Sequence, residues 1–163
     1  MFHSLQEFYT TWKHESASTL SLFERLTDES LDHKVWAEGR TLARLANHII
    51  ESLSELPSKL QLGIEEEHPD HHTVAALLKN YKESSDTLIE AIKTKWTDAS
   101  LLEKNNMYGQ EWKNSFSLWA LVAHQIHHRG QMTVLMRQAG IKIPGLYGPA
   151  KEEWEAMGRK ALV

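Results

Sequence analysis

The sequence predicts an all-α protein, an antiparallel four-helix bundle that is followed by a short C-terminal helix. Four long segments carry apolar residues at every third or fourth position, which is the spacing of an amphipathic helix. Helices of this length that are joined by loops and are apolar along one stripe favour a bundle. We find no convincing strand, internal repeat or low-complexity tract. A chain of 163 residues, 41% hydrophobic, suits a single domain over residues 1–163.

The first helix is expected at about residues 4–27. Its start is indicated by Ser4-Leu5-Gln6-Glu7, the pattern of a capping box, and its end by the turn-prone Asp28-Glu29-Ser30. The apolar stripe between these limits consists of Leu5, Phe8, Trp12, Thr19, Phe23 and Leu26.

The second helix is expected after Gly39, with Thr41 as its N-cap. Pro57 should kink or restart this helix, because proline lacks the N–H that a helix interior needs. The helix is recognised by apolar residues at helical spacing, which are Leu42, Leu45, Ala46, Ile49, Leu53 and Leu56.

The third helix is expected from Val74 to Trp96, after a polar, acidic loop. Residues 97–113 are interpreted as a connecting loop, with Asn105-Asn106 and Gly109 as helix breakers. The stripe of this helix consists of Val74, Leu78, Tyr81, Ser85, Leu88, Ile92 and Trp96.

The fourth helix is expected at about residues 115–139, with Gly140 as its C′ residue. Between Asn114 and Met136 its only formally charged side chain is Arg129, so we expect it to be buried almost all round. A segment rich in proline and glycine then precedes a short helix that contains Trp154.

Composition excludes several classes of protein. The net charge is −4 with a pI near 6.2, and no cluster of Lys and Arg suggests nucleic-acid binding. Without cysteine there is no disulfide, thiolate nucleophile or Cys-ligated zinc, so any metal must be held by His and carboxylates. We find no secretory signal and no apolar run that could cross a bilayer, and therefore expect a soluble cytoplasmic protein that binds no membrane.

The run His124-Gln125-Ile126-His127-His128-Arg129-Gly130-Gln131 is the strongest functional signal. Helical residues four apart share one face, so His124 and His128 can bind one metal ion. A helical wheel places them on a polar strip that also includes Gln131. Because Gln125 stands where a zinc protease has its Glu, that mechanism is not supported.

A third ligand should come from a facing helix, and His48 is the best candidate. It lies mid-helix on the shoulder of the apolar stripe. The alternative is a half-buried histidine that only forms hydrogen bonds.

The neighbours of the pair suggest supporting roles. His127 points about 100° from the Ile126 face and away from the midline of His124 and His128, which favours a role in packing or in contacting a metal ligand. Gln131 could orient a ligand or a bound water, or could be satisfied by backbone. For Arg129 we favour an ion pair with an acidic neighbour over contact with a substrate anion.

Other histidines and tryptophans are interpreted as ordinary residues. The cluster of His68, His71 and His72 lies in the acidic loop and should be solvated. The six Trp should mostly be core residues, except Trp36 and Trp112, which lie in loop-like sequence.

Three segments together resemble the DinB-like superfamily of metal-dependent enzymes. They are His124 to Gln131, the run from Gly39 to His48, and the tail from Gly140 to Pro149. The resemblance implies a four-helix bundle, often dimeric, with a divalent metal held by three histidines. Carried over, these ligands are His48, His124 and His128.

Two classes of function follow. Three neutral imidazoles leave the metal charge uncompensated and a position open, as in catalytic sites, and nitrogen ligands suit Zn, Ni, Cu or Fe. The superfamily includes bacillithiol S-transferases and a mycothiol-dependent isomerase, so the resemblance implies a transferase of low-molecular-weight thiols in detoxification or stress response; metal-dependent hydrolysis is the other catalytic reading. The second class is a non-catalytic metal-binding stress-response protein. We also expect a small-molecule substrate. A homodimer is expected as well, because six Trp exceed what one small core needs.

Overall fold

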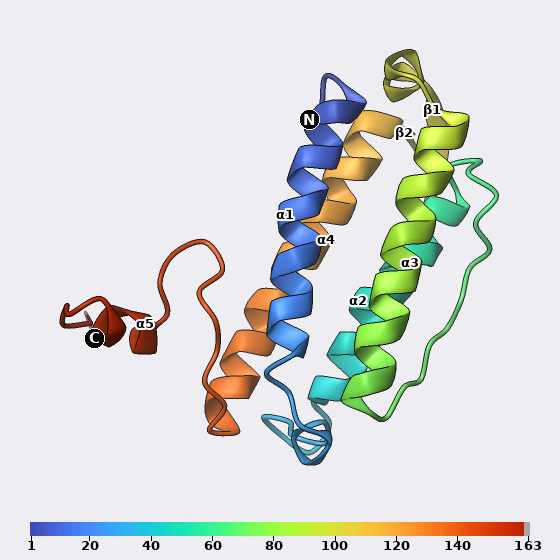
Figure 1. Cartoon of the computed structure of the whole chain (residues 1–163). Coiled ribbons are helices and arrows are strands. Elements are labelled where there is room, and N and C mark those ends of the chain that lie inside the picture. The colour runs from blue at the N-terminus through green and yellow to red at the C-terminus, as the bar shows by residue number, and fades with distance from the viewer. Residues whose placement is uncertain (162–163) are drawn as a thin grey trace.

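Four long helices form the body of the protein (Figure 1). In this computed structural model, which describes residues 1–161, they are α1 (Leu5–Phe23), α2 (Leu42–Ser58), α3 (Val74–Lys95) and α4 (Asn114–Gln138). Helix α2 packs against α3 and α4, and α1 packs against the same two helices. The four-helix bundle that the sequence predicts is therefore confirmed.

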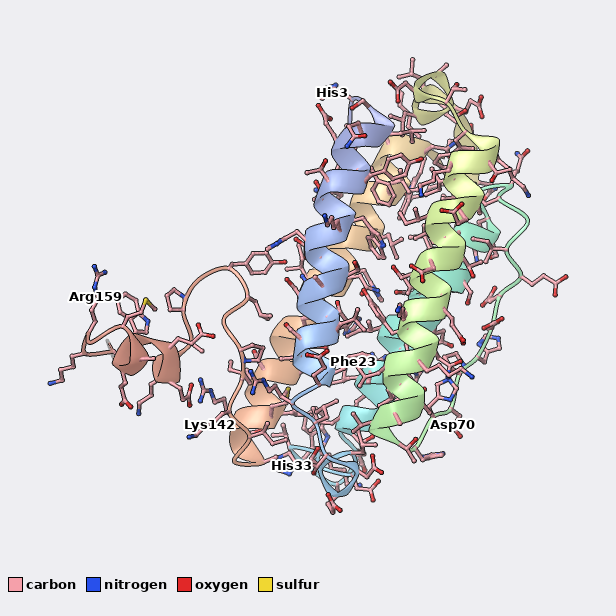
Figure 2. All side chains as sticks on the ribbon, viewed as in Figure 1. His3, Phe23, His33, Asp70, Lys142 and Arg159 are labelled. Atoms are coloured by element: carbon pink, nitrogen blue, oxygen red, sulfur yellow. The ribbon has the colours of Figure 1, made fainter. Side chains whose placement is uncertain are left out.

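The directions of the helices follow from which ends lie together. Asp28, just after α1, accepts a hydrogen bond from the backbone N–H of Val74 at the start of α3, so α1 and α3 are antiparallel. His33 and Asp70, which precede α2 and α3, both lie at the end of the bundle opposite His3 (Figure 2). Helices α2 and α3 therefore run in the same direction, and the loop over 59–73 passes along the bundle to join them (Figure 1).

Polar side chains cap the helices where the sequence places them. The Ser4 hydroxyl accepts the N–H of Glu7 at 3.2 Å, and that of Thr41 accepts the N–H of Arg44 at 3.0 Å. Helix α1 ends at Phe23, shorter than expected. The expected effect of Pro57 is wrong, because Pro57 lies in the last turn of α2, which ends at the next residue without restarting.

Helix α4 ends as its glycine predicts. Gly140 has a φ of 75°, which a residue without a side chain adopts freely. Its N–H donates to the Arg137 carbonyl at 3.1 Å, and the N–H of Ile141 donates to Met136 at 2.8 Å. These two bonds are the Schellman motif, which satisfies the last carbonyls of a helix.

A small hairpin corrects the prediction that residues 97–113 form only a loop. After a short 3-10 helix (Asp98–Leu102), β1 (Lys104–Met107) pairs antiparallel with β2 (Gln110–Lys113). Tyr108 and Gly109 form the turn, with φ of 55° and 83°. Such turns are usually signalled by Asn-Gly or Asp-Gly, and four-residue strands are too short to show a clear alternation.

The core lies between the four helices, but α4 is not buried all round as expected. Its inner face is buried and includes Leu118, Leu121 and Met132. On its outer face, Trp119 is 45% exposed and Val134 is 56% exposed. The scarcity of charge on α4 therefore does not mean that the helix is enclosed.

The chain leaves the bundle after α4. A loop leads to α5 (Lys151–Ala156), which has no buried residue and stands to one side of the bundle (Figure 1). Arg159, beyond α5, lies at the far end of this segment (Figure 2). Across residues 1–161, no helix has both the length and the apolar character needed to cross a membrane.

Candidate metal centre

Three histidines from two helices meet between α2 and α4. His48 comes from α2, and His124 and His128 come from adjacent turns of α4. One nitrogen of each ring lies within 4.8 Å of one nitrogen of the other two, close enough for the three to hold one metal ion. The ring centroids are 4.9 Å apart for His48 and His124, 4.6 Å for His48 and His128, and 4.4 Å for the α4 pair.

Hydrogen bonds orient two of the three rings. Nδ1 of His48 lies 3.1 Å from Oε2 of Glu51, and Nδ1 of His128 lies 2.7 Å from Oε1 of Gln131. In both pairs the acceptor favours a proton on Nδ1 and leaves the Nε2 lone pair available. Nε2 of His128 lies 3.1 Å from Nε2 of His124, so the two nitrogen atoms that could bind a metal ion face each other.

His124 differs from the other two rings. Its Nδ1 is buried and has no hydrogen-bond partner within residues 1–161. Buried polar atoms are normally satisfied, and two imidazole nitrogens that face each other at 3.1 Å need a proton or a cation between them. The donor set thus fits a divalent metal ion, since neutral imidazole nitrogens are common ligands for such ions.

The electrostatics favour the ligating form of the histidines. Burial, followed by the charge of the neighbouring histidines, lowers the pKa of both His124 and His128 to about 4. Both rings are therefore neutral at pH 7, the form in which imidazole binds a metal.

Glu51 is a functional residue that the sequence reasoning missed. Its carboxylate contacts His48, and it also lies 2.9 Å from Nδ1 of His68 and 3.2 Å from Nη2 of Arg44. Partial burial would raise the pKa of Glu51, but the hydrogen bonds from His68, His48 and Arg44 lower it to about 2. The available signal was its position three residues after His48, on the same side of a helix.

Of the cluster of His68, His71 and His72, His68 and His72 are solvent-exposed, as expected. The His68 side chain is 72% exposed, but it also bonds to Glu51, the carboxylate that contacts His48. His71 is held through its backbone, which exchanges two hydrogen bonds of 2.9 Å with the side chain of Asn47. His72 is exposed and lies 3.4 Å from Asp70. The three histidines therefore do not form one site.

The same side of α2 fixes the loop over 59–73. Asn47, Glu51 and Ser54 lie one turn apart, and each bonds to this loop. The Ser54 hydroxyl accepts the N–H of Glu67 at 3.0 Å. The loop thus covers the helix that supplies His48.

The remaining predicted residues lie around the group. Gln131 is exposed and contacts His128 through its side chain, not through backbone. His127 is exposed, with its ring centroid 4.8 Å from that of His128, and it is outside the group of three. Gln125 is buried and donates to the Ile49 carbonyl at 2.9 Å, so it joins α4 to α2.

Arg129 forms the ion pair that we favoured. It is 1% exposed and bonds to the carboxylate of Glu15 on α1. It also donates to the Thr19 hydroxyl at 3.0 Å and contacts Tyr147, whose hydroxyl donates to Glu15 at 2.6 Å. This charged cluster joins α1, α4 and the C-terminal segment. It does not include α2, the helix that supplies His48.

Two cavities adjoin the histidines. The smaller, about 270 Å³, is lined by His124, Glu55, Tyr108 and Trp112, among others. Tyr108 donates its hydroxyl proton to Glu55 at 2.6 Å. The larger, about 510 Å³, is lined by Gln131, whose side chain bonds to His128, and by residues of the loop before α2.

The two loop tryptophans differ from the core ones. Trp36 is 62% exposed and lines the larger cavity, and Trp112 is half-buried and lines the smaller. Of the four tryptophans expected in the core, Trp12 and Trp96 are buried there. The expectation is wrong for Trp119, which is 45% exposed on α4, and for Trp154, which is half-buried on α5. Both exceptions that the sequence indicated therefore lie beside the histidine group.

Comparison with known proteins gives consistent matches over the whole chain. A sequence model of the DinB family matches residues 1–161. A protein of Bacillus subtilis (strain 168), "Uncharacterized protein YrdA", is 41% identical over 164 residues, which cover 99% of this chain and 98% of that protein.

Solved structures agree with these matches. A DinB-like protein from Bacillus cereus ATCC 10987 is 37% identical, with a TM-score of 0.86, over 90% of this chain and 100% of that one. YjoA, a DinB-like protein from Bacillus subtilis, is 17% identical with a TM-score of 0.70, over 86% and 96% of the two chains, and supports the fold alone. From the match over residues 1–161 and the 41% identity, this chain belongs to the DinB family.

Proposed function

We propose that the protein is a metal-dependent enzyme that binds one divalent transition-metal ion per chain through His48, His124 and His128. The observation that carries this proposal is the group of three nitrogens within 4.8 Å, to which no carboxylate of residues 1–161 contributes. A structural site is normally closed by four protein ligands, whereas three leave a position for water or substrate. The two cavities beside the group would give a substrate access to that position.

The ion would supply a Lewis acid that lowers the pKa of a bound water or thiol. His48 and His128 keep their Nε2 atoms directed inward because Glu51 and Gln131 hold their Nδ1 atoms.

We propose transfer of a low-molecular-weight thiol, in detoxification or stress response, as the reaction. This extends the family resemblance, and it is supported by the donor set, because an uncompensated cation favours the thiolate form of a bound thiol. The proposal includes a small-molecule substrate and a cytoplasmic location.

Hydrolysis is the second candidate, and Glu55 favours it. This carboxylate lines the cavity beside His124 and could accept a proton from a water molecule bound there. It already accepts a hydrogen bond from Tyr108, which would hold it in position. The third candidate, a metal that only joins α2 to α4, would require another ligand to close the site.

The first experiment measures metal content after loading with Zn, Ni or Mn and removal of excess ion. We expect about one ion per chain, with loss of binding in His48→Ala and His124→Ala. Full stoichiometry in both variants would show that the site is misplaced.

The second experiment tests the reaction. The loaded protein should accelerate conjugation of bacillithiol, glutathione or cysteine to monochlorobimane, and His128→Ala should abolish the acceleration. Absence of acceleration with every thiol and metal would exclude thiol transfer to this electrophile. Hydrolysis of p-nitrophenyl acetate that requires Glu55 would then favour the second candidate.

A further inference from the structure

The larger cavity beside the histidines has one preformed wall, the turn that precedes α2. The N–H of Gly39 donates to the Trp36 carbonyl at 2.9 Å, which closes the turn. A Cβ at Gly39 would lie 3.0 Å from the indole ring of Trp36, so the ring rests against the glycine. The segment before this turn is fixed to the start of α2 by two backbone hydrogen bonds. The N–H of Leu42 donates to the His33 carbonyl at 3.0 Å, and the N–H of Ala43 donates to the Leu31 carbonyl at 2.9 Å.

The cavity combines apolar walls with few polar groups. Its apolar lining consists of Val35, Trp36, Leu45, Val134 and Leu135, and its polar lining of Glu38, Arg40 and Gln131. A volume of about 510 Å³ lies within the usual range of sites for small organic molecules. An exposed indole beside four aliphatic side chains suits the flat apolar body of such a molecule.

Arg40 is the positively charged side chain of this lining. It forms no ion pair or side-chain hydrogen bond with residues 1–161, whereas Arg44, one turn further, is paired with Glu51. Glu38 is the acidic side chain of the same lining, so the preference of the cavity for an anion over a neutral molecule is the property that an experiment must measure.

The cavity is connected to the metal group through Gln131. Gln131 lines it and bonds to Nδ1 of His128 at 2.7 Å. Leu45, in its floor, lies one turn before His48 on α2. A molecule held here would therefore lie next to Gln131, the residue that contacts His128.

We propose that this cavity binds a small organic acid, with its carboxylate on Arg40 and its apolar body against Trp36. A single free guanidinium matches one carboxylate, which it can bind in a bidentate manner. A phosphate would need more donors than this lining offers. The proposal rests on the proposed function only in that the bound acid is taken to be a substrate of the metal site.

The test compares two probes of the same shape, 1-naphthaleneacetate and the neutral 1-naphthaleneacetamide, by calorimetric titration of the metal-free protein. We expect the acid to bind about fivefold more tightly than the amide, the upper range for an exposed ion pair. Arg40→Gln should remove this preference, and Arg44→Gln is the matched control that should keep it. Trp36→Ala should weaken binding of both probes.

Each outcome decides the proposal. Equal binding of acid and amide, no binding of either, or an unchanged preference in Arg40→Gln would overturn it. The titration contains no metal, so its result remains valid even if the three histidines bind no metal ion. Conversely, Arg40→Gln should still bind one metal ion per chain, which keeps a failure of the cavity distinct from a failure of the metal centre.

Discussion

Glu51→Gln is the sharpest test of how the metal centre is built. The substitution keeps the size of the side chain but removes the negative charge that faces Nδ1 of His48 at 3.1 Å. A carboxylate behind a ligating imidazole fixes its orientation and raises its basicity, and loss of such a partner usually weakens metal binding by about 10- to 100-fold. We expect a decrease in metal affinity within this range.

The loss can be read from thermal stability. A ligand that binds only the native state stabilises it in proportion to the logarithm of its affinity, so this decrease removes about 1.4–2.7 kcal/mol of metal-dependent stabilisation at a fixed excess of metal. For a domain of this size each kcal/mol is worth about 2–4 °C in Tm. The rise in Tm on adding metal should therefore be smaller by roughly 3–11 °C in the variant.

The measurement is differential scanning calorimetry with and without metal, on wild type and on two variants. Glu55→Gln is the matched control, because Glu55 lies one turn further on α2, accepts a hydrogen bond from Tyr108 and forms no hydrogen bond with a histidine of residues 1–161. Its metal-dependent rise in Tm should be close to that of wild type. If Glu51→Gln lowers Tm equally with and without metal, Glu51 acts only in the fold and the reasoning is refuted.

Three further predictions concern α4 and the residues that contact it. His128→Ala should abolish tight metal binding and His127→Ala should keep one ion per chain by metal analysis; the reverse result would make the three-residue spacing the ligand pair. Glu15→Gln should lower the free energy of unfolding by about 3–5 kcal/mol in urea titrations, because it leaves buried Arg129 without its counter-charge; a loss below about 1 kcal/mol would contradict this. We also propose a homodimer: light scattering should give about twice 18.7 kDa, and Ile126→Glu should give the monomer. A wild-type mass near that of one chain would exclude the dimer.

The four helices could be predicted because each follows from local signals. Apolar spacing, the caps at Ser4 and Thr41, and Gly140 act over a few residues, so the sequence contains them directly. The histidine pair on α4 follows from the same geometry. His48 could be named as a candidate from its position on the shoulder of the apolar stripe, but the sequence left open whether it binds the metal, and the family resemblance favoured ligation.

The parts that sequence reasoning missed depend on the course of the connections. The bond from His68 to Glu51 exists because the loop over 59–73 passes back along α2, which no local pattern indicates. Once that course is known, Asn47, Glu51 and Ser54 are seen to lie on one side of α2 and to hold the loop. A histidine in an acidic loop is then a partner of the metal site's carboxylate and no longer an isolated solvated residue.

The outer face of α4 gives the low charge of this helix a second explanation. Phe116, Trp119, Ala123, Ile126 and Gly130 recur at alternating steps of three and four, the spacing of a seam between two helices. Trp119 and Ile126 are 45% and 38% exposed, so the described chain leaves part of this seam uncovered, although Trp112 packs against Phe116 at one end. A seam with Ile126 near its centre and no charged side chain along it suits a two-fold contact with a second copy, in which each α4 meets the other. The same helix would then present its histidines to the metal on one side and its partner subunit on the other.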